Sequence, residues 1–237
     1  MIVLFTDFGL EGPYVGQMKA VLHRHAPGVP VVDLFADAPV FDAKRSAYLL
    51  SAYASEFPAP AVFLAVVDPG VGGDRRPIVE MCIRDRDNGL FELVWRRATQ
   101  RQAFAVDWRP DRLSASFHGR DLFAPMAARL AWGNTAGLSP IDRLPPRDWP
   151  DDLAEIVYVD RYGNAMTGLR AASLAEDAVI EAGDRSLKRL RTFSDAAPGD
   201  GFWYENANGL AEIAVNRGRA DWDLGLTIGS LVTVTGS

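Results

Sequence analysis

The first 132 residues alternate short apolar runs with longer amphipathic segments. Apolar runs of strand length occupy residues 2–6, 29–35 and 61–68. Between them, residues 14–25 and 42–57 carry apolar side chains three and four positions apart, which is the period of one helix face. Apolar strands that alternate with helices are typical of an α/β layered domain whose sheet is mostly parallel.

The pattern changes after residue 132. A helix is expected to begin with Asp121 as its N-cap, to carry Pro125 in its first turn and to stop at Gly133. Residues 133–153 are rich in Pro, Gly and Asp without an apolar period, which predicts a linker. Residues 154–237 consist of short alternating segments separated by Gly, Asn and Asp, which predicts a small antiparallel β domain, either a barrel or a sandwich.

Composition and charge narrow the class of protein. The chain is 48% hydrophobic, with a net charge of −6 and no basic stripe, which argues against a nucleic-acid or anionic-membrane partner. Cys82 is the single cysteine, so no internal disulfide is possible. The longest apolar run, residues 61–67, is far shorter than a membrane span, and the opening residues lack the basic flank of a signal peptide. We therefore expect a cytoplasmic protein.

Two carboxylates follow predicted strands directly. In an open α/β sheet Asp7 and Asp68 would lie at the carboxyl ends of strands, where ligands bind, although each alone is also an ordinary turn or cap residue. Asp68 opens the glycine-rich segment DPGVGGDRRP, in which Arg75 or Arg76 can fold back to pair with it. The alternative is a solvated surface turn that contributes little stability. The segment lacks the GK[ST] ending of a phosphate-binding loop.

His118 is the histidine best placed for chemistry. It precedes a predicted helix in a loop that can present a side chain to a cleft, whereas His23 and His25 complement the dipole at a helix end. In the second domain, Asp160 and Asn164 flank a turn that is either a structural hairpin or a grip for a zwitterion. In the second case the carboxylate accepts from an ammonium group and the amide donates to a carboxylate. No spacing typical of metal ligands occurs, so no metal site is predicted.

Seven motifs follow one another along nearly the whole chain: TDFG at 6–9, YVGQMKA at 14–20, DPGVGGDRRP at 68–77, DNGL at 87–90, FHGRDLFAP at 117–125, DRYGN at 160–164 and NANGLAEIAVNRG at 206–218. Together they resemble the S-adenosyl-L-methionine (SAM) hydroxide adenosyltransferases, or SAM hydrolases, which are relatives of the SAM-dependent chlorinases and fluorinases. The resemblance implies hydrolysis of SAM to adenosine and L-methionine by attack of an activated water on ribose C5′, without a cofactor or metal.

The resemblance also implies roles for individual residues and an assembly. Residues 1–132 would bind SAM and carry the catalysis, residues 154–237 would contribute methionine and adenine contacts, and a homotrimer would form its sites between the first domain of one subunit and the second domain of its neighbour. By this resemblance, Asp7 would bind the ribose hydroxyls, Phe41 would lie against the sugar, and Asp160 and Asn164 would bind the methionine amino-acid group. The backbone around Asn216 and Arg217 would contact adenine. Asp68, Arg75 and His118 would handle the attacking water, and spacing favours Arg75 over Arg76.

Other functions remain as alternatives. Asp68 stands at the position where halogenating relatives carry a tyrosine, and a carboxylate there would repel chloride, which favours hydrolysis. A chlorinase-like halogenase and a non-catalytic SAM- or adenosine-binding protein are the next hypotheses. A metal-dependent phosphohydrolase built on the Asp residues is more remote, and EDTA would reveal it.

Two features depart from the family pattern. Ala207 stands where many relatives have Ser, and residues 81–86, MCIRDR, replace a turn and second strand. Either this hexamer is a shortened natural edge with solvated Arg84, Asp85 and Arg86, or it is translated adaptor DNA; we favour the second, because similar strings recur in unrelated translated assemblies. Resequencing the source gene distinguishes the two. Nothing near Cys82 marks a lowered thiol pKa, so we do not interpret it as a nucleophile.

Overall fold

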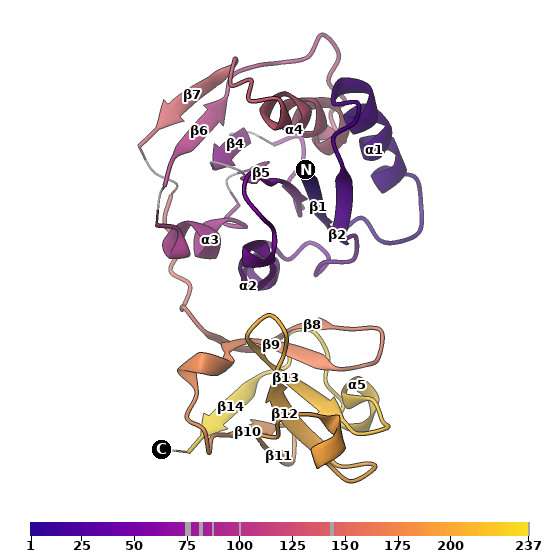
Figure 1. Cartoon of the computed structure of the whole chain (residues 1–237), viewed down its shortest axis with the longest axis vertical. Helices are drawn as coiled ribbons and strands as arrows, with labels where there is room; N and C mark the ends of the chain where they lie inside the picture. Colours follow the sequence, from indigo (N-terminus) through magenta and orange to yellow (C-terminus); the bar gives the residue numbers. More distant parts are fainter. Residues whose placement is uncertain (74–76, 81–82, 87, 100, 143–144, 237) are drawn as a thin grey trace. The chain divides into compact units, whose positions relative to one another are not determined.

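The computed structural model divides into two compact units, Met1–Asp148 and Trp149–Ser237 (Figure 1). It describes the chain except for residues 74–76, 81–82, 87, 100, 143–144 and 237, and the side chains of residues 80 and 83–86 are also not described. Among the described helices, none has the length and apolar character needed to cross a bilayer.

The first unit is built on a seven-stranded sheet of order β2-β1-β3-β5-β4-β6-β7. From β2 to β5 the neighbouring strands are parallel, and from β5 to β7 they are antiparallel. This confirms the expected α/β class and adds an antiparallel half to its sheet. The strands are β1 (Ile2–Thr6), β2 (Val31–Phe35), β3 (Val62–Val66), β4 (Pro77–Glu80), β5 (Ile83–Arg86), β6 (Ala103–Val106) and β7 (Leu138–Ile141).

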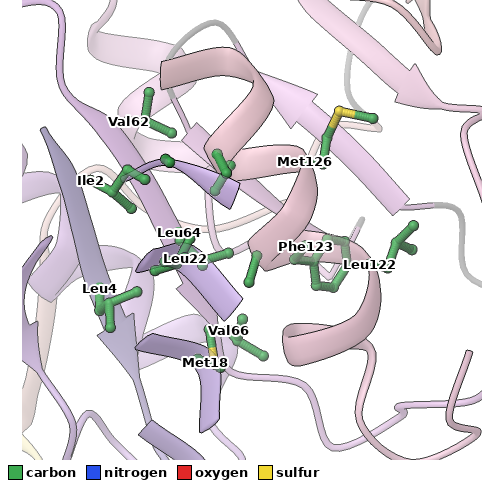
Figure 2. Packing of buried hydrophobic residues seen from close by; sticks show 14 of the residues in the cluster. Ile2, Leu4, Met18, Leu22, Val62, Leu64, Val66, Leu122, Phe123 and Met126 are labelled. Atoms are coloured by element: carbon green, nitrogen blue, oxygen red, sulfur yellow. The ribbon is translucent and has the colours of Figure 1, made fainter. Parts of the chain in front are cut away.

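Helices cover this sheet where the apolar period predicted them. The first has the expected bounds, and the second begins after Asp42, whose side chain accepts from the Arg45 N–H. Figure 2 shows the main core, in which residues of β1 and β3 such as Leu4 and Leu64 pack against Leu22 of the first helix and Phe123. The helical elements are α1 (Tyr14–His25), α2 (Ala43–Tyr53), η1 (Ala54–Glu56), α3 (Glu92–Arg97), η2 (Gly119–Phe123, a π-turn) and α4 (Ala124–Ala131).

The helix expected from Asp121 begins earlier than predicted. The π-turn η2 starts at Gly119 and runs into α4, so Asp121 lies inside the helical segment and is not its N-cap. Its carboxylate accepts from the Ser114 N–H at 2.8 Å and from Arg120 at 2.6 Å instead. Pro125 lies in the first turn of α4, as expected.

Two further expectations need correction. Strand β7 lies inside the predicted linker 133–153, because residues 138–141 pair with β6 at the edge of the sheet. Strand β5 comes from the hexamer 81–86 and pairs with β3 on one side and β4 on the other. The interpretation of Arg84, Asp85 and Arg86 as charges of an edge strand is therefore wrong. Met81 and Cys82 lie outside the described residues, and the adaptor hypothesis stays a prediction.

The second unit is a β-barrel made of two antiparallel sheets. Its two sheets have the orders β12-β13-β9-β8 and β11-β10-β14, and two isolated bridges, Glu155 to Leu231 and Arg189 to Trp203, join them at both ends. Trp203 is fully buried in the core between them, and its indole N–H donates to the Ala178 carbonyl at 3.0 Å. The elements are β8 (Leu153–Val159), β9 (Ala165–Arg170), η3 (Ala171–Ser173), β10 (Val179–Ala182), β11 (Arg185–Lys188), η4 (Phe193–Asp195), β12 (Gly201–Glu205), β13 (Leu210–Val215), α5 (Ala220–Asp223) and β14 (Val232–Thr235).

Candidate active site

A pocket of about 330 Å³ in the first unit gathers four of the predicted site residues. Asp7 follows β1 and Asp68 follows β3, and these neighbouring parallel strands end in register, so both carboxylates reach the same edge of the sheet. Phe41 and His118 reach the pocket from loops far away in the sequence. The lining comprises Asp7, Phe8, Tyr14, Val40, Phe41, Val66, Asp68, Val71, Ser116, Phe117, His118, Gly119 and Phe123.

Asp7 and Phe41 hold each other in place. The Phe41 N–H donates to Oδ2 of Asp7 at 2.9 Å, and Phe41 has a φ of 60°, in the left-handed region that disfavours residues with a side chain. The residue Phe41 is 71% exposed. Burial raises the pKa of Asp7, the hydrogen bond from Phe41 opposes this, and the negative charge of Asp68 raises the pKa further. Asp7 is thus a partly desolvated acceptor beside an exposed aromatic ring.

Asp68 begins a turn that its own side chain closes. Its Oδ1 accepts from the Gly70 N–H at 3.0 Å. Gly72 has a φ of 85°, and a Cβ there would lie 2.7 Å from the Ala115 carbonyl oxygen, so the turn packs closely on the segment that leads to His118. Arg75 and Arg76 lie outside the described residues, so their pairing with Asp68 stays a prediction.

Asn88 supports this end of β3, a role that the sequence reasoning missed. Its Nδ2 donates to the Val67 carbonyl at 2.6 Å, and its Oδ1 accepts from the Leu90 N–H at 3.0 Å. The DNGL motif thereby ties its own turn to the residue that precedes Asp68. The available signal was the motif itself, because an Asn in a turn frequently bonds to nearby backbone.

His118 is buried, 9% exposed, at the start of the π-turn, beside an apolar wall. The rings of Phe8, Tyr14 and Phe117 contact one another in this wall, with centroids 5.4 to 5.9 Å apart. None of these three rings was predicted as a site residue. These rings place apolar surface next to two carboxylates and an imidazole, which lowers the local polarity and strengthens electrostatic interactions there.

In the second unit, Asp160 and Asn164 are paired with each other. Oδ1 of Asp160 accepts from the Asn164 N–H at 2.9 Å, and Oδ2 accepts from the Asn164 side-chain amide at 3.1 Å. Gly163 between them has a φ of 85°, and a Cβ there would lie 2.4 Å from Oδ1 of Asp221. One amide hydrogen of Asn164 is therefore engaged within the turn.

The backbone of Asn216 is hydrogen-bonded inside the second unit, and its role toward adenine stays a prediction. Its N–H donates to the Asp200 carbonyl at 3.0 Å, and its carbonyl accepts from the Gly199 N–H at 2.8 Å, so its N–H is committed inside the unit. Arg217 has an exposed side chain and a φ of 59°. Of the two, Arg217 is the residue that the structure turns toward solvent.

Sequence reasoning missed the buried carboxylate of Glu212, which is 3% exposed in β13. Tyr204 and Asn206 donate to it at 2.5 and 2.9 Å. Burial raises its pKa, while the hydrogen bonds from Tyr204 and Asn206 oppose that shift. The available signal was a single acidic residue inside the apolar segment LAEIAV. Among the residues that the structure describes, no group of three or more His, Cys, Asp or Glu side chains is arranged to hold a metal ion.

Comparison with known proteins covers both units. Residues 2–138 match the family model of the SAM hydroxide adenosyltransferase N-terminal domain, and residues 154–233 match that of the C-terminal domain. The chain is 40% identical to an (R)-S-adenosyl-L-methionine hydrolase of Thermus thermophilus, over 96% of each chain. It is 39% identical to the hydrolase of the same name from Salinispora arenicola, over 97% of this chain and 95% of that one.

Two solved structures share the fold of this chain. An uncharacterized conserved protein from Thermotoga maritima superposes with a TM-score of 0.90 at 27% identity, over 99% of this chain and 100% of the other. A conserved hypothetical protein from Thermus thermophilus superposes with a TM-score of 0.77 at 38% identity, over 99% of both chains.

Proposed function

Because this chain belongs to the SAM hydroxide adenosyltransferase family, we propose that it hydrolyses SAM to adenosine and L-methionine, with the Asp7–Asp68–His118 pocket as the reaction site. The near full-length match to two (R)-S-adenosyl-L-methionine hydrolases supports the reaction. The observation that carries the site is the pocket itself, which collects Asp7, Phe41, Asp68 and His118 from four separate segments.

In this proposal Asp7 binds the ribose diol. A carboxylate has two acceptor oxygens, and Oδ2 already holds the Phe41 N–H at 2.9 Å, which fixes its direction. The exposed Phe41 ring then lies against one face of the sugar. Together these contacts would hold ribose C5′ at a constant place relative to Asp68, which is what an in-line displacement requires.

Asp68 orients and deprotonates the attacking water. The water oxygen forms a bond to C5′ while the C5′–S bond breaks, and the electron pair of that bond goes to sulfur. Methionine leaves as a neutral thioether, so no general acid is needed. The water proton passes to the Asp68 carboxylate. His118 and Arg75 are the other two residues that we propose to act on this water.

One feature of the pocket favours water over a halide as the nucleophile. Asp68 places a negative charge in the pocket, which would repel chloride. The rings of Phe8, Tyr14 and Phe117 add apolar surface to the same pocket. This low-dielectric surrounding strengthens the interaction between the carboxylate and the water that it holds.

The second unit supplies the remaining substrate contacts in this proposal. Asp160 accepts from the ammonium group of methionine, Asn164 binds its carboxylate, and the segment of Asn216 and Arg217 reads adenine, with Arg217 as the main contributor. We further propose a homotrimer in which these groups complete the pocket of a neighbouring subunit. Support comes from the apolar lining of that pocket, where Val40 and Phe41 are 62% and 71% exposed.

The reaction is tested by chromatography of purified protein incubated with SAM, with and without chloride and with and without EDTA. Adenosine and methionine in equal amounts, unaffected by both additions, are the expected result. Chloride-dependent 5′-chloro-5′-deoxyadenosine would identify a halogenase, and loss of activity with EDTA would reveal a metal requirement. A SAM-dependent rise in melting temperature without product would identify a binding protein and refute the proposal.

The assembly is tested by light scattering on the eluting protein. A homotrimer has three times the chain mass of 25.9 kDa. A monomer that hydrolyses SAM at full rate would refute the shared site but not the reaction.

A further inference from the structure

Glu212 is a buried carboxylate whose hydrogen-bond partners are neutral groups. It is 3% exposed, its Oε1 accepts from the Tyr204 hydroxyl at 2.5 Å, and its Oε2 accepts from the Asn206 amide at 2.9 Å. Acidic side chains are almost never fully buried without a specific reason, and well-packed apolar side chains are often at least as stabilising at such positions. The neighbouring residues of β13 are apolar, so barrel stability alone does not explain this residue.

The two amides near Glu212 each close a different turn. Oδ1 of Asn206 accepts from the N–H groups of Asn208 and Leu210, both at 3.0 Å, which closes the turn between β12 and β13. Asn164 closes the turn that precedes β9, through its two bonds to Asp160. Both amide side chains are buried, with 9% and 7% exposure for Asn206 and Asn164.

Glu212 also lies close to the 160–164 turn, because β13 pairs with β9 and Glu212 is opposite Met166, two residues after Asn164. After burial and the bonds from Tyr204 and Asn206, its pKa responds to the negative charge of Asp160, which raises it, and to the Asn164 amide, which lowers it. Tyr204 lies opposite Glu212 in the pairing of β12 with β13, so the carboxylate is held from a third side. One buried group therefore connects residues 160–164 with residues 206–210.

We infer that Glu212 is a positioning residue that holds the 160–164 turn and the 206–210 turn in fixed relation, and so shapes the grip on the amino-acid group of the substrate. This inference rests on the proposed function, in which Asp160 and Asn164 bind that group.

The test compares two substrates that differ only in the part Glu212 serves. SAM carries the amino-acid group, and a 5′-deoxy-5′-dimethylsulfonium adenosine lacks it but keeps the sulfonium and the sugar. Glu212→Gln removes the charge, and its single side-chain oxygen can no longer accept from the Tyr204 hydroxyl and the Asn206 amide with one oxygen each. We expect the KM for SAM to rise about tenfold with kcat nearly unchanged, and the KM for the truncated sulfonium to stay constant.

Three further variants separate this role from general stability. Tyr204→Phe removes the 2.5 Å bond while keeping the ring, and should raise the KM for SAM in the same direction by a smaller factor. Thr167→Val removes a different buried hydrogen bond, 2.7 Å to the Ala211 carbonyl, and should lower the melting temperature without changing either KM. Asp160→Ala tests whether Asp160 binds the amino-acid group of the substrate at all.

The outcomes are distinguishable. If Asp160→Ala leaves the KM for SAM unchanged, the proposed substrate grip fails and the role of Glu212 fails with it. If Asp160→Ala raises this KM but Glu212→Gln and Tyr204→Phe only lower the melting temperature, as Thr167→Val does, the inference about Glu212 is overturned while the proposed function stands. An equal rise of KM for both substrates would also overturn it. If Glu212→Gln does not fold, Tyr204→Phe decides between these outcomes.

Discussion

Asp68→Asn changes the charge beside the proposed attacking water while it leaves the shape of the site almost unaltered. The Asp68 side chain closes its turn by accepting from the Gly70 N–H at 3.0 Å, and the carbonyl oxygen of an Asn can accept the same bond. We therefore expect the free energy of unfolding to change by less than about 1 kcal/mol. An amide cannot take a proton from water, so the variant removes the general base.

The expected loss follows from what a positioned general base contributes. That contribution is about 10² to 10⁴ in rate, which corresponds to roughly 3 to 5 kcal/mol in the activation barrier. The charge has a second effect, because the negative charge of Asp68 raises the pKa of Asp7. Its removal should lower the pKa of Asp7 and move the acid limb of SAM binding to lower pH.

The assay measures adenosine release for kcat and KM, together with the SAM-dependent shift in melting temperature. Asp107→Asn makes the same chemical change at a carboxylate outside the pocket lining, where it bonds to Ser139, and should retain full activity. The variant should still be stabilised by SAM, which would show that the substrate binds without turnover. An Asp68→Asn enzyme with kcat within about threefold of the native value would refute the assignment.

Three other outcomes are expected. As the pH is lowered, the KM for SAM should begin to rise before pH 3.8 is reached, because burial raises the pKa of Asp7 and a protonated Asp7 is a weaker acceptor. A KM that rises only below pH 3.8 would contradict this. Burial acts to raise the pKa of Asp152, but the hydrogen bonds from Arg170, at 2.8 and 2.6 Å, leave it lowered. Asp152→Asn should therefore cost about 1 kcal/mol in urea unfolding at neutral pH, and this difference should vanish as the pH falls below 3.8 through the native pKa. Gly163→Ala should lower the melting temperature and raise the KM for SAM, since its Cβ would lie 2.4 Å from Asp221, and an unchanged KM would show that the turn does not hold the substrate.

The sequence by itself determined the central strands and the place of the two carboxylates. The apolar runs at residues 2–6 and 62–66 became β1 and β3, because strands covered on both faces need no polar residues. Parallel neighbours end at the same edge of a sheet, and Thr6 pairs with Val66. Asp7 and Asp68 therefore meet in one pocket, as their positions after the strands predicted.

Elements that depend on pairing rather than on apolar period were not predictable in this way. Strand β7 contains Pro140 and follows Gly137, so its composition is typical of a linker, and only its pairing with β6 makes it a strand. The charged residues of β5 suggested an edge, yet its backbone pairs on both sides. Local composition describes a segment alone, whereas a sheet is decided by which segments meet.

The tertiary structure alone decided the surroundings of the site residues. The left-handed backbone of Phe41 follows from a bond to Asp7, thirty-four positions away. The burial of Glu212 follows from its place opposite Tyr204 and beside Asn164, which come from other strands and turns. Residue types and motifs indicate which groups a site uses, but desolvation and hydrogen-bond partners arise from contacts distant in sequence, and these contacts set the pKa and the orientation of each group.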